Sequence, residues 1–179
     1  NGTIYSKENA VISVFDRGFL YGDSVFETIR VYNKSPYALS KHLNRLKQSG
    51  IKIAFDLPWS QSTLIDRTIK TLTAANFDEA YLRIIATRGS GVLGLDPCLA
   101  SEPTLIIFVL PLPPLDSTIY QNGLSAKLVS IRRNLKVAID PMAKTGNYIN
   151  SIMALSEARQ AGADEAIMMD NEGRIAESS

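Results

Sequence analysis

The sequence has very few of the side chains that disulfides and most metal sites require. One cysteine, Cys98, and one histidine, His42, occur in 179 residues. A single cysteine excludes an intrachain disulfide and is typical of a reducing compartment, so we expect a cytoplasmic protein. A lone thiol can act as a nucleophile, but nothing in the local sequence activates Cys98. A metal site would have to rest on carboxylates, and because no acidic motif is clustered, we expect no metal.

Long apolar runs and an excess of one charge are also missing. The apolar run Thr104–Leu110 has the length of a buried strand and is far too short to span a membrane. Lysine and arginine total 19 against 18 aspartates and glutamates, and the longest basic run is the pair Arg132-Arg133. Such balanced, interspersed charge does not indicate nucleic-acid binding. We therefore expect neither a membrane nor a nucleic-acid partner.

Proline is concentrated at one place, the segment Leu110–Asp116. Prolines there disfavour both a helix and a strand ladder, which makes the segment the best domain boundary in the chain. We expect an N-terminal α+β domain over residues 1–110, a linker over 111–121 and the first part of a second domain over 122–179. The second part is shorter than a two-layer domain usually needs.

The first half of the chain alternates strand and helix patterns. Residues 15–32 form a glycine-punctuated loop that leads into a strand with an aromatic face. That face can either pack against a helix or line a pocket. Strands are also predicted for residues 1–5, 10–14, 80–89 and 104–110, and helices for 39–50, with Ser40 as N-cap and Gly50 as the end, and for 61–75.

In the second half of the chain, the pattern predicts that Lys144 lies at the point where a loop turns into a helix. Thr145 or Asn147 can cap that helix, and Gly162 ends it. Most lysines are solvated at the surface, and Lys144 can be read in that way too. Strands are predicted for residues 124–131, 166–169 and 174–177, with an apolar run at 137–139 and a turn at 170–173, which places Glu177 on a strand.

Two runs of sequence resemble the class IV (fold type IV) pyridoxal phosphate enzymes. They are Pro-Met-Ala-Lys-Thr-Gly-Asn-Tyr-Ile-Asn-Ser from Pro141 and Gly-Arg-Ile-Ala-Glu-Ser-Ser from Gly173. The resemblance implies pyridoxal 5'-phosphate as cofactor, with Lys144 forming the internal Schiff base. It also implies that Tyr148 lies near the phenolic oxygen and that Glu177 faces the pyridine nitrogen. A carboxylate there keeps the nitrogen protonated, so the ring can accept electrons from a substrate carbanion.

Two earlier motifs extend this resemblance. Asp-x-Gly-x-x-x-Gly-Asp-x-Phe-Glu-x-Ile-Arg, beginning at Asp16, resembles the family signature whose tyrosine and phenylalanine line the substrate pocket. Those roles fall to Tyr21 and Phe26, and Arg30 remains as a structural ion-pair residue. A His-x-x-Arg-Leu run matches the family's phosphate-binding arginine, which is Arg45 here. A guanidinium suits this task because its fork binds phosphate oxygens in a bidentate manner and keeps its charge.

The strand over residues 80–89 places Tyr81 and Arg83 on one face. In the family, a Tyr-x-Arg pair here touches substrate carboxylates, although Arg83 can instead pair with a structural acid, Glu79 or Asp78. The following Gly-x-Gly-x-Leu-Gly-Leu-Asp-Pro loop is similar to that of branched-chain enzymes, where it reaches the neighbouring subunit's site. A phosphate-cradling role for the loop is disfavoured because a strand, and no helix, follows it.

The resemblance covers nearly the whole chain and implies an α+β, two-domain fold type IV enzyme. It would have an N-terminal α/β sandwich-like domain and a β-barrel-like C-terminal domain with helices. Because the chain stops at Ser179, within a family motif, we expect it to be a piece of a longer protein that also lacks the initiator region.

The implied activity is ping-pong transamination of a branched-chain L-amino acid with 2-oxoglutarate through a Lys144 aldimine, in a homodimer or higher homo-oligomer. Lys144, Arg45 and Glu177 would equally serve a D-amino acid aminotransferase or an aminodeoxychorismate lyase. The motifs therefore do not define the amino donor or its stereochemistry. A catalytically inactive homologue that acts as a binding protein is the alternative from another class.

Overall fold

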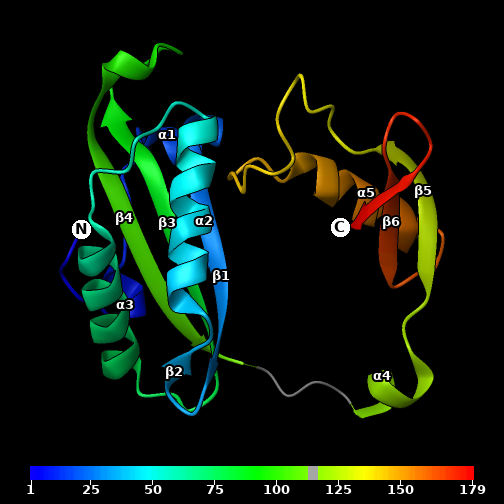
Figure 1. Ribbon diagram of the computed structural model, residues 1–179, viewed down its shortest axis with the longest axis horizontal. Coiled ribbons are helices and arrows are strands. Elements are labelled where there is room, and N and C mark those ends of the chain that lie inside the picture. The colour runs from blue at the N-terminus through cyan, green and yellow to red at the C-terminus, as the bar shows by residue number, and fades with distance from the viewer. Residues whose placement is uncertain (113–116) are drawn as a thin grey trace. The chain divides into compact units, whose positions relative to one another are not determined.

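The computed structural model describes residues 1–112 and 117–179, which fall into two compact units (Figure 1). The N-terminal unit comprises Asn1–Leu112 together with Ala143–Gly146, and the C-terminal unit comprises the rest. The four residues Ala143–Gly146 thus belong to the N-terminal unit, whereas the sequence pattern placed them in the second domain. Of the predicted linker, residues 113–116 lie outside the described residues.

The N-terminal unit is built on a four-stranded antiparallel sheet with the order β2-β1-β3-β4. Its register places Thr28 opposite Arg83, and Arg83 opposite Phe108. β4 continues through Pro111, the residue at which the prediction begins the linker. Pro111 is tolerated because it stands at the end of a strand that lies at the sheet edge. The strands are β1 (Ser24–Tyr32), β2 (Ser35–Pro36), β3 (Ala80–Gly91) and β4 (Ala100–Pro111).

Two helices, α2 (Leu39–Lys52) and α3 (Gln61–Ala75), pack on one face of this sheet (Figure 1). α3 has the predicted bounds, and its N-cap Ser60 accepts a hydrogen bond from the Thr63 amide. α2 begins after Ala38 without the predicted Ser40 cap and continues through Gly50. Buried apolar side chains fill the space between sheet and helices: Val25, Ile29, Val31, Leu43, Leu46, Leu64, Leu72, Leu82 and Ile84.

The N-terminal residues differ from their predicted structure. Residues 1–5 and 10–14 are irregular and flank a 3-10 turn, η1 (Lys7–Asn9). Apolar alternation alone does not make a strand, because a strand also needs a partner for its backbone groups. In the predicted loop the chain forms a short helix, α1 (Arg17–Tyr21), which Asp16 caps through the Gly18 amide. A second 3-10 turn, η2 (Pro97–Leu99), precedes β4.

The C-terminal unit contains a three-stranded sheet, β5-β6-β7, with β5 (Ala126–Arg132), β6 (Glu165–Met169) and β7 (Ile175–Ser178). β5 and β6 are parallel, so a crossover must join them, and α5 (Ile149–Gln160) provides it. β6 and β7 form the predicted antiparallel hairpin. The helix α5 packs on the sheet through small residues, with Ala154 and Ala158 buried against Val129 and Met168.

The starts of the helices in this unit were not all predicted. Tyr148 occupies the N-cap position of α5 without a side-chain cap bond, whereas Thr145 or Asn147 was the expected cap. The apolar run at 137–139 is not a strand, and Val137 is exposed. A short helix, α4 (Ser117–Asn122), precedes β5.

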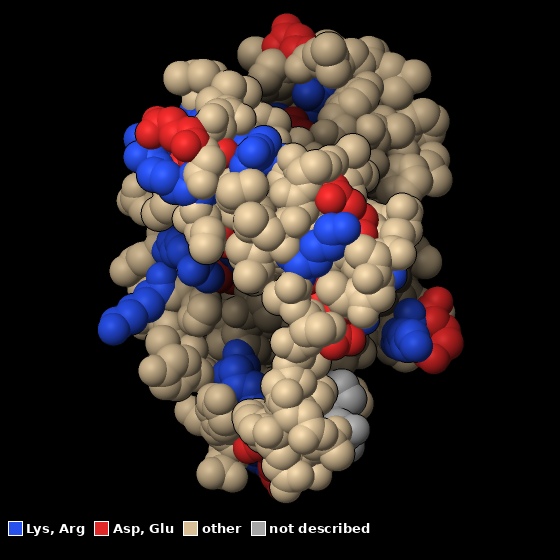
Figure 2. Space-filling view, turned by 90° about the vertical axis from the view of Figure 1, so that its right-hand side faces the viewer, with Lys and Arg blue, Asp and Glu red and all other residues tan. Residues whose placement is uncertain are grey.

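Surface charges of both signs lie beside each other on the face shown in Figure 2. The surface ion pairs of the C-terminal unit include Arg159 with Asp164 and Arg174 with Asp170. Within residues 1–112 and 117–179, no helix has both the length and the apolar character that crossing a membrane demands.

Candidate active site

Lys144 lies on a segment that pairs with the open edge of β1. β2 occupies that edge only at Val31 and Tyr32. Near the other end of β1, the Phe26 amide donates to the Lys144 carbonyl at 3.0 Å, and the Gly146 amide donates to Ser24 O at 2.9 Å. Lys144 is therefore held beside β1 next to an isolated β-bridge that joins Thr145 to Val25. The helix predicted to start beside it begins only at Ile149.

Two further contacts fix this segment. The Lys144 amide donates to Ser49 Oγ at 3.1 Å, and Ser49 is a buried residue of α2. At Gly146 a Cβ would collide with Ser24 Oγ, so only glycine permits the observed approach to β1. The backbone of Lys144 is thus positioned by both the sheet edge and the helix.

The side chains of Lys144 and Arg83 both lie against the aromatic ring of Phe26. Lys144 Nζ lies 4.5 Å from the centroid of the Phe26 ring, and Arg83 Cζ lies 3.9 Å from the same centroid. Phe26 is almost fully buried. The two positive charges favour an anion at this site, and the ring beside them offers an apolar surface.

Arg83 extends the cluster to Tyr81 and Thr28. Its Nη1 donates to the Tyr81 hydroxyl at 3.2 Å, and that hydroxyl lies 3.3 Å from Thr28 Oγ1. Arg83 Nε is buried and has no hydrogen-bond partner among the described residues. A buried donor without a partner costs roughly 1 to 3 kcal/mol, and a carboxylate would relieve that cost.

The acids that could have neutralised Arg83 are engaged elsewhere. Glu79 pairs with Arg30, and Asp78 lies 3.5 Å from Lys34 Nζ. The structural ion pair that the sequence pattern allows for Arg83 is therefore absent from the described contacts. Arg30 has the structural role expected of it.

Arg45 lies on the helix-covered side of β1, beside a buried acid. Glu27 accepts hydrogen bonds from Arg45 Nε and Nη2, both at 2.5 Å, and lies 2.8 Å from His42 Nδ1. The Glu27 side chain is 0% exposed, whereas that of Arg45 is 54% exposed. Glu27 thus orients the guanidinium of an arginine whose side chain is about half exposed. The sequence contained a signal for this acid, because Glu27 shares its strand face with Val25 and Ile29.

The C-terminal unit carries the other two predicted cofactor contacts, Tyr148 and Glu177. Glu177 lies on β7, as predicted, and pairs with Arg133 Nε. Arg133 Nη1 also donates to Asn150 Oδ1 at 3.1 Å. Arg133 was not predicted, because in sequence it belongs to a basic pair that resembles ordinary surface charge.

The structure therefore brings Lys144, Phe26, Arg83 and Tyr81 together and holds Arg45 on the other side of β1. Tyr21 ends α1, where its hydroxyl accepts a hydrogen bond from the Gly94 amide at 3.3 Å.

Comparison with known proteins identifies the family. The family described as Amino-transferase class IV matches residues 24–179. The chain belongs to the class IV aminotransferases. This membership agrees with the fold, since solved branched-chain aminotransferases superpose on nearly the whole chain.

Three similar proteins illustrate the relationship. A Methanocaldococcus jannaschii protein named "Putative branched-chain-amino-acid aminotransferase" is 40% identical over 177 residues, which cover 99% of this chain and 60% of that protein. The structure of the Escherichia coli branched-chain amino acid aminotransferase has a TM-score of 0.92 at 30% identity and covers 99% of this chain and 60% of its own. The branched-chain aminotransferase of the thermophilic archaeon Thermoproteus uzoniensis, solved with norvaline, has a TM-score of 0.88 at 32% identity, with 99% and 60% covered. The chain thus spans about 60% of the length of these class IV relatives.

Proposed function

We propose that the whole protein transfers an amino group from a branched-chain L-amino acid to 2-oxoglutarate by a ping-pong mechanism, with pyridoxal 5'-phosphate as cofactor. The observation that carries this proposal is the cluster at Phe26. There a buried apolar ring and a buried guanidinium donor without a partner lie beside the lysine of the family motif. Such a site can accept an apolar side chain and a carboxylate in turn.

The donor set of the chain fits the cofactor. Lys144 supplies a primary amine, and Arg45 supplies an exposed guanidinium held by Glu27, which suits a phosphate group. Tyr148 and Glu177 would contact the ring, with Glu177 at its nitrogen and Arg133 beside that carboxylate. When bound, the cofactor supplies an electron sink for the electron pair left at the substrate α-carbon.

Lys144 is the residue that moves a proton in this scheme. Its Nζ would take the proton from the substrate α-carbon and return one in the other half of the reaction, which requires an approach of about 3 Å. The two backbone bonds of Lys144 and its contact with Phe26 restrict where Nζ can go. β1 and α2 thus contribute to the chemistry by limiting the positions that Nζ can adopt.

The same pocket must hold two kinds of side chain. Phe26, Tyr21 and Tyr148 would form apolar walls for leucine, isoleucine or valine, whose full burial contributes roughly 1.5 to 3 kcal/mol. A glutamate side chain brings a carboxylate that would be costly to bury without a partner. Arg83 would receive that carboxylate through its buried Nε, which has no hydrogen-bond partner among the described residues, while the Tyr81 hydroxyl would serve the α-carboxylate.

We also propose that the protein acts as a homodimer. Phe19, Val92, Leu93 and Leu95 are all exposed on α1 and the loop after β3. An exposed apolar group of this kind favours a protein partner, and a second copy of the chain would cover it.

The experiment that tests the activity is a donor panel with the full-length protein and 2-oxoglutarate. L-leucine, L-isoleucine and L-valine should each give glutamate, whereas D-alanine should give none. Glutamate formed only from D-alanine would establish a D-amino acid aminotransferase. Turnover of aminodeoxychorismate alone would establish the lyase, and no turnover of any donor would favour a binding protein.

A further inference from the structure

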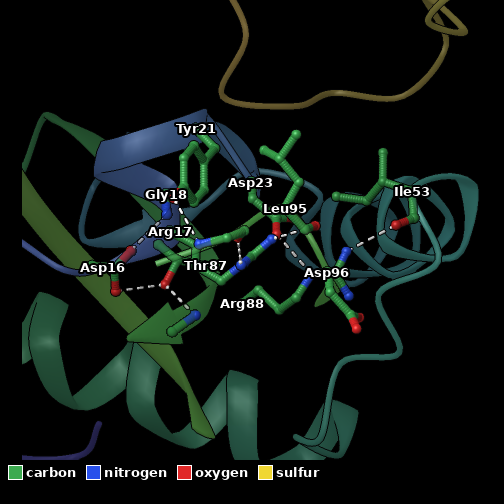
Figure 3. A network of polar contacts seen from close by, with 12 residues as sticks. Asp16, Arg17, Gly18, Tyr21, Asp23, Ile53, Thr87, Arg88, Leu95 and Asp96 are labelled. Carbon is green, nitrogen blue, oxygen red and sulfur yellow. Dashed lines mark hydrogen bonds and ion pairs between the residues drawn. The ribbon is translucent and has the colours of Figure 1, made fainter. Parts of the chain in front are cut away.

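A second cluster of charges lies at the junction of α1 and β1 (Figure 3). One oxygen of Asp23, Oδ2, accepts from Arg17 Nε at 3.0 Å and from Arg88 Nε at 2.8 Å. All three side chains are largely buried. Burial raises the pKa of the Asp23 carboxyl, but the hydrogen bonds from Arg88 and Arg17 outweigh it and lower the pKa below its ordinary value.

Each arginine uses its remaining nitrogens to hold two consecutive carbonyls. Arg17 Nη1 and Nη2 donate to Gly94 O at 2.8 Å and Leu95 O at 3.1 Å. Arg88 Nη1 and Nη2 donate to the carbonyls of Ala54 and Ile53, both at 2.9 Å. Asp23 therefore connects the loop after β3 with the turn after α2.

The loop after β3 has little packing of its own. Val92, Leu93 and Leu95 are 71%, 63% and 80% exposed. Gly94 has φ of +149°, a conformation that other residues rarely adopt. Within one chain, its shape therefore comes largely from hydrogen bonds, and two of these come from the buried Arg17.

The loop in turn fixes the Tyr21 hydroxyl. The Gly94 amide donates to the Tyr21 oxygen at 3.3 Å. Because a backbone N–H can only donate, the phenol proton of Tyr21 is not used in this bond. Arg17 also lies against the Tyr21 ring, with Cζ 5.2 Å from the centroid. The direction in which Tyr21 donates its proton thus depends on where Arg17 holds the loop.

We propose that Arg17, Asp23 and Arg88 are positioning residues that aim the Tyr21 hydroxyl at a carboxylate of the substrate. This inference rests on the proposed function, since it takes an amino acid or a 2-oxo acid as the ligand. The three residues act through Gly94 and Tyr21, and none of them contacts the substrate. Asp23 is the centre of the network, because its charge holds both guanidinium groups.

The first test needs no activity. In full-length Asp23→Asn, hydrogen exchange of the Gly94 amide should quicken about tenfold, the loss expected when one hydrogen bond of about 1.4 kcal/mol weakens. Glu79→Gln is the matched control, because it disrupts the Arg30 ion pair on the same sheet and should leave Gly94 unchanged. Unchanged exchange in Asp23→Asn, or equal changes in both variants, would overturn the inference.

The second test is a double-mutant cycle on the full-length enzyme. Asp23→Asn and Tyr21→Phe should each raise KM for 2-oxoglutarate about tenfold with kcat within about twofold. The double variant should be no worse than the single ones, because both changes remove the same contact. Multiplicative effects, or a fall in kcat without a change in KM, would refute the positioning role.

Two further outcomes are distinguishable. If Asp23→Asn does not fold, Arg17→Lys replaces it in both tests, since a lysine keeps the charge but lacks the fork that holds Gly94 and Leu95. If the wild-type protein transaminates no donor, the proposed function fails and the role assigned to Tyr21 fails with it. The exchange test then still decides whether Asp23 holds the loop.

Discussion

Replacing Arg83 by methionine separates the two half-reactions. The change removes the buried Nε and the bond from Nη1 to Tyr81, while an apolar chain of similar length remains against Phe26. A dicarboxylate such as 2-oxoglutarate loses its charge partner, which costs roughly 2 to 5 kcal/mol. At about 1.4 kcal/mol for each factor of ten, this half-reaction should weaken roughly 30-fold to several thousand-fold.

The half-reaction with leucine should change little. Leucine has no distal charge, and the loss of the Arg83 contact with Phe26 removes about 0.5 to 1 kcal/mol, or about two- to fivefold. Tyr81 retains its contact with Thr28 and so can still serve the α-carboxylate. The ratio between the two half-reactions is therefore the informative quantity.

Single-turnover kinetics measure each half-reaction separately through the change in cofactor absorbance. Arg30→Met is the matched control, because Arg30 projects from the same sheet face but pairs with the exposed Glu79. It should affect both half-reactions alike, if at all. Equal losses in both half-reactions of Arg83→Met would refute the role of Arg83 and indicate a structural function.

Other variants test the cofactor contacts, the Lys144 segment and the Asp23 network. Arg45→Ala should weaken cofactor binding by about 1.5 to 3 kcal/mol, and excess cofactor should restore its rate. Glu177→Gln should bind the cofactor normally but react slowly. Cofactor titration and rate measurements on both variants distinguish these effects. Gly146→Ala should destabilise the protein by about 1 to 3 kcal/mol in urea unfolding, and Ser24→Ala should restore stability by removing the hydroxyl that the new Cβ would meet. Because the folded pKa of Asp23 is depressed, its stabilisation is present above the ordinary pKa of about 3.9 and is lost as the pH falls through the folded value. The difference in unfolding free energy between wild type and Asp23→Asn, measured in urea, should therefore begin to narrow as the pH falls below about 4.

Where one face of an element is buried, its pattern predicted its structure well. β1, β3 and α3 each bury a regular set of apolar side chains in the core, and their periods of 2 or 3.6 residues are visible in the sequence. The hairpin of β6 and β7 was predictable because its turn joins strands adjacent in the chain.

Local sequence patterns could not predict where Lys144 lies in the fold. Its segment pairs with β1 through contacts between residues more than a hundred positions apart, such as Lys144 with Phe26. Helical spacing downstream suggested only that a helix was near. The strands predicted for residues 1–5 and 10–14 were wrong for a related reason. Alternation of apolar residues does not specify which strand a segment pairs with.

The residues that support the site were harder to predict than those of the site itself. Motif resemblance named Lys144, Arg45 and Arg83 but gave no role to Glu27 or Asp23. A charged residue at a buried position is informative because burial requires a partner, yet the partner is known only once the chain is folded.

The central claim is that Lys144 carries the cofactor, and borohydride reduction tests it most directly. Full-length protein loaded with pyridoxal 5'-phosphate should, after reduction and digestion, carry the pyridoxyl group on the peptide that contains Lys144. Lys144→Ala should carry none at that site. A label on Lys127 or Lys136, or on no lysine, would contradict the account.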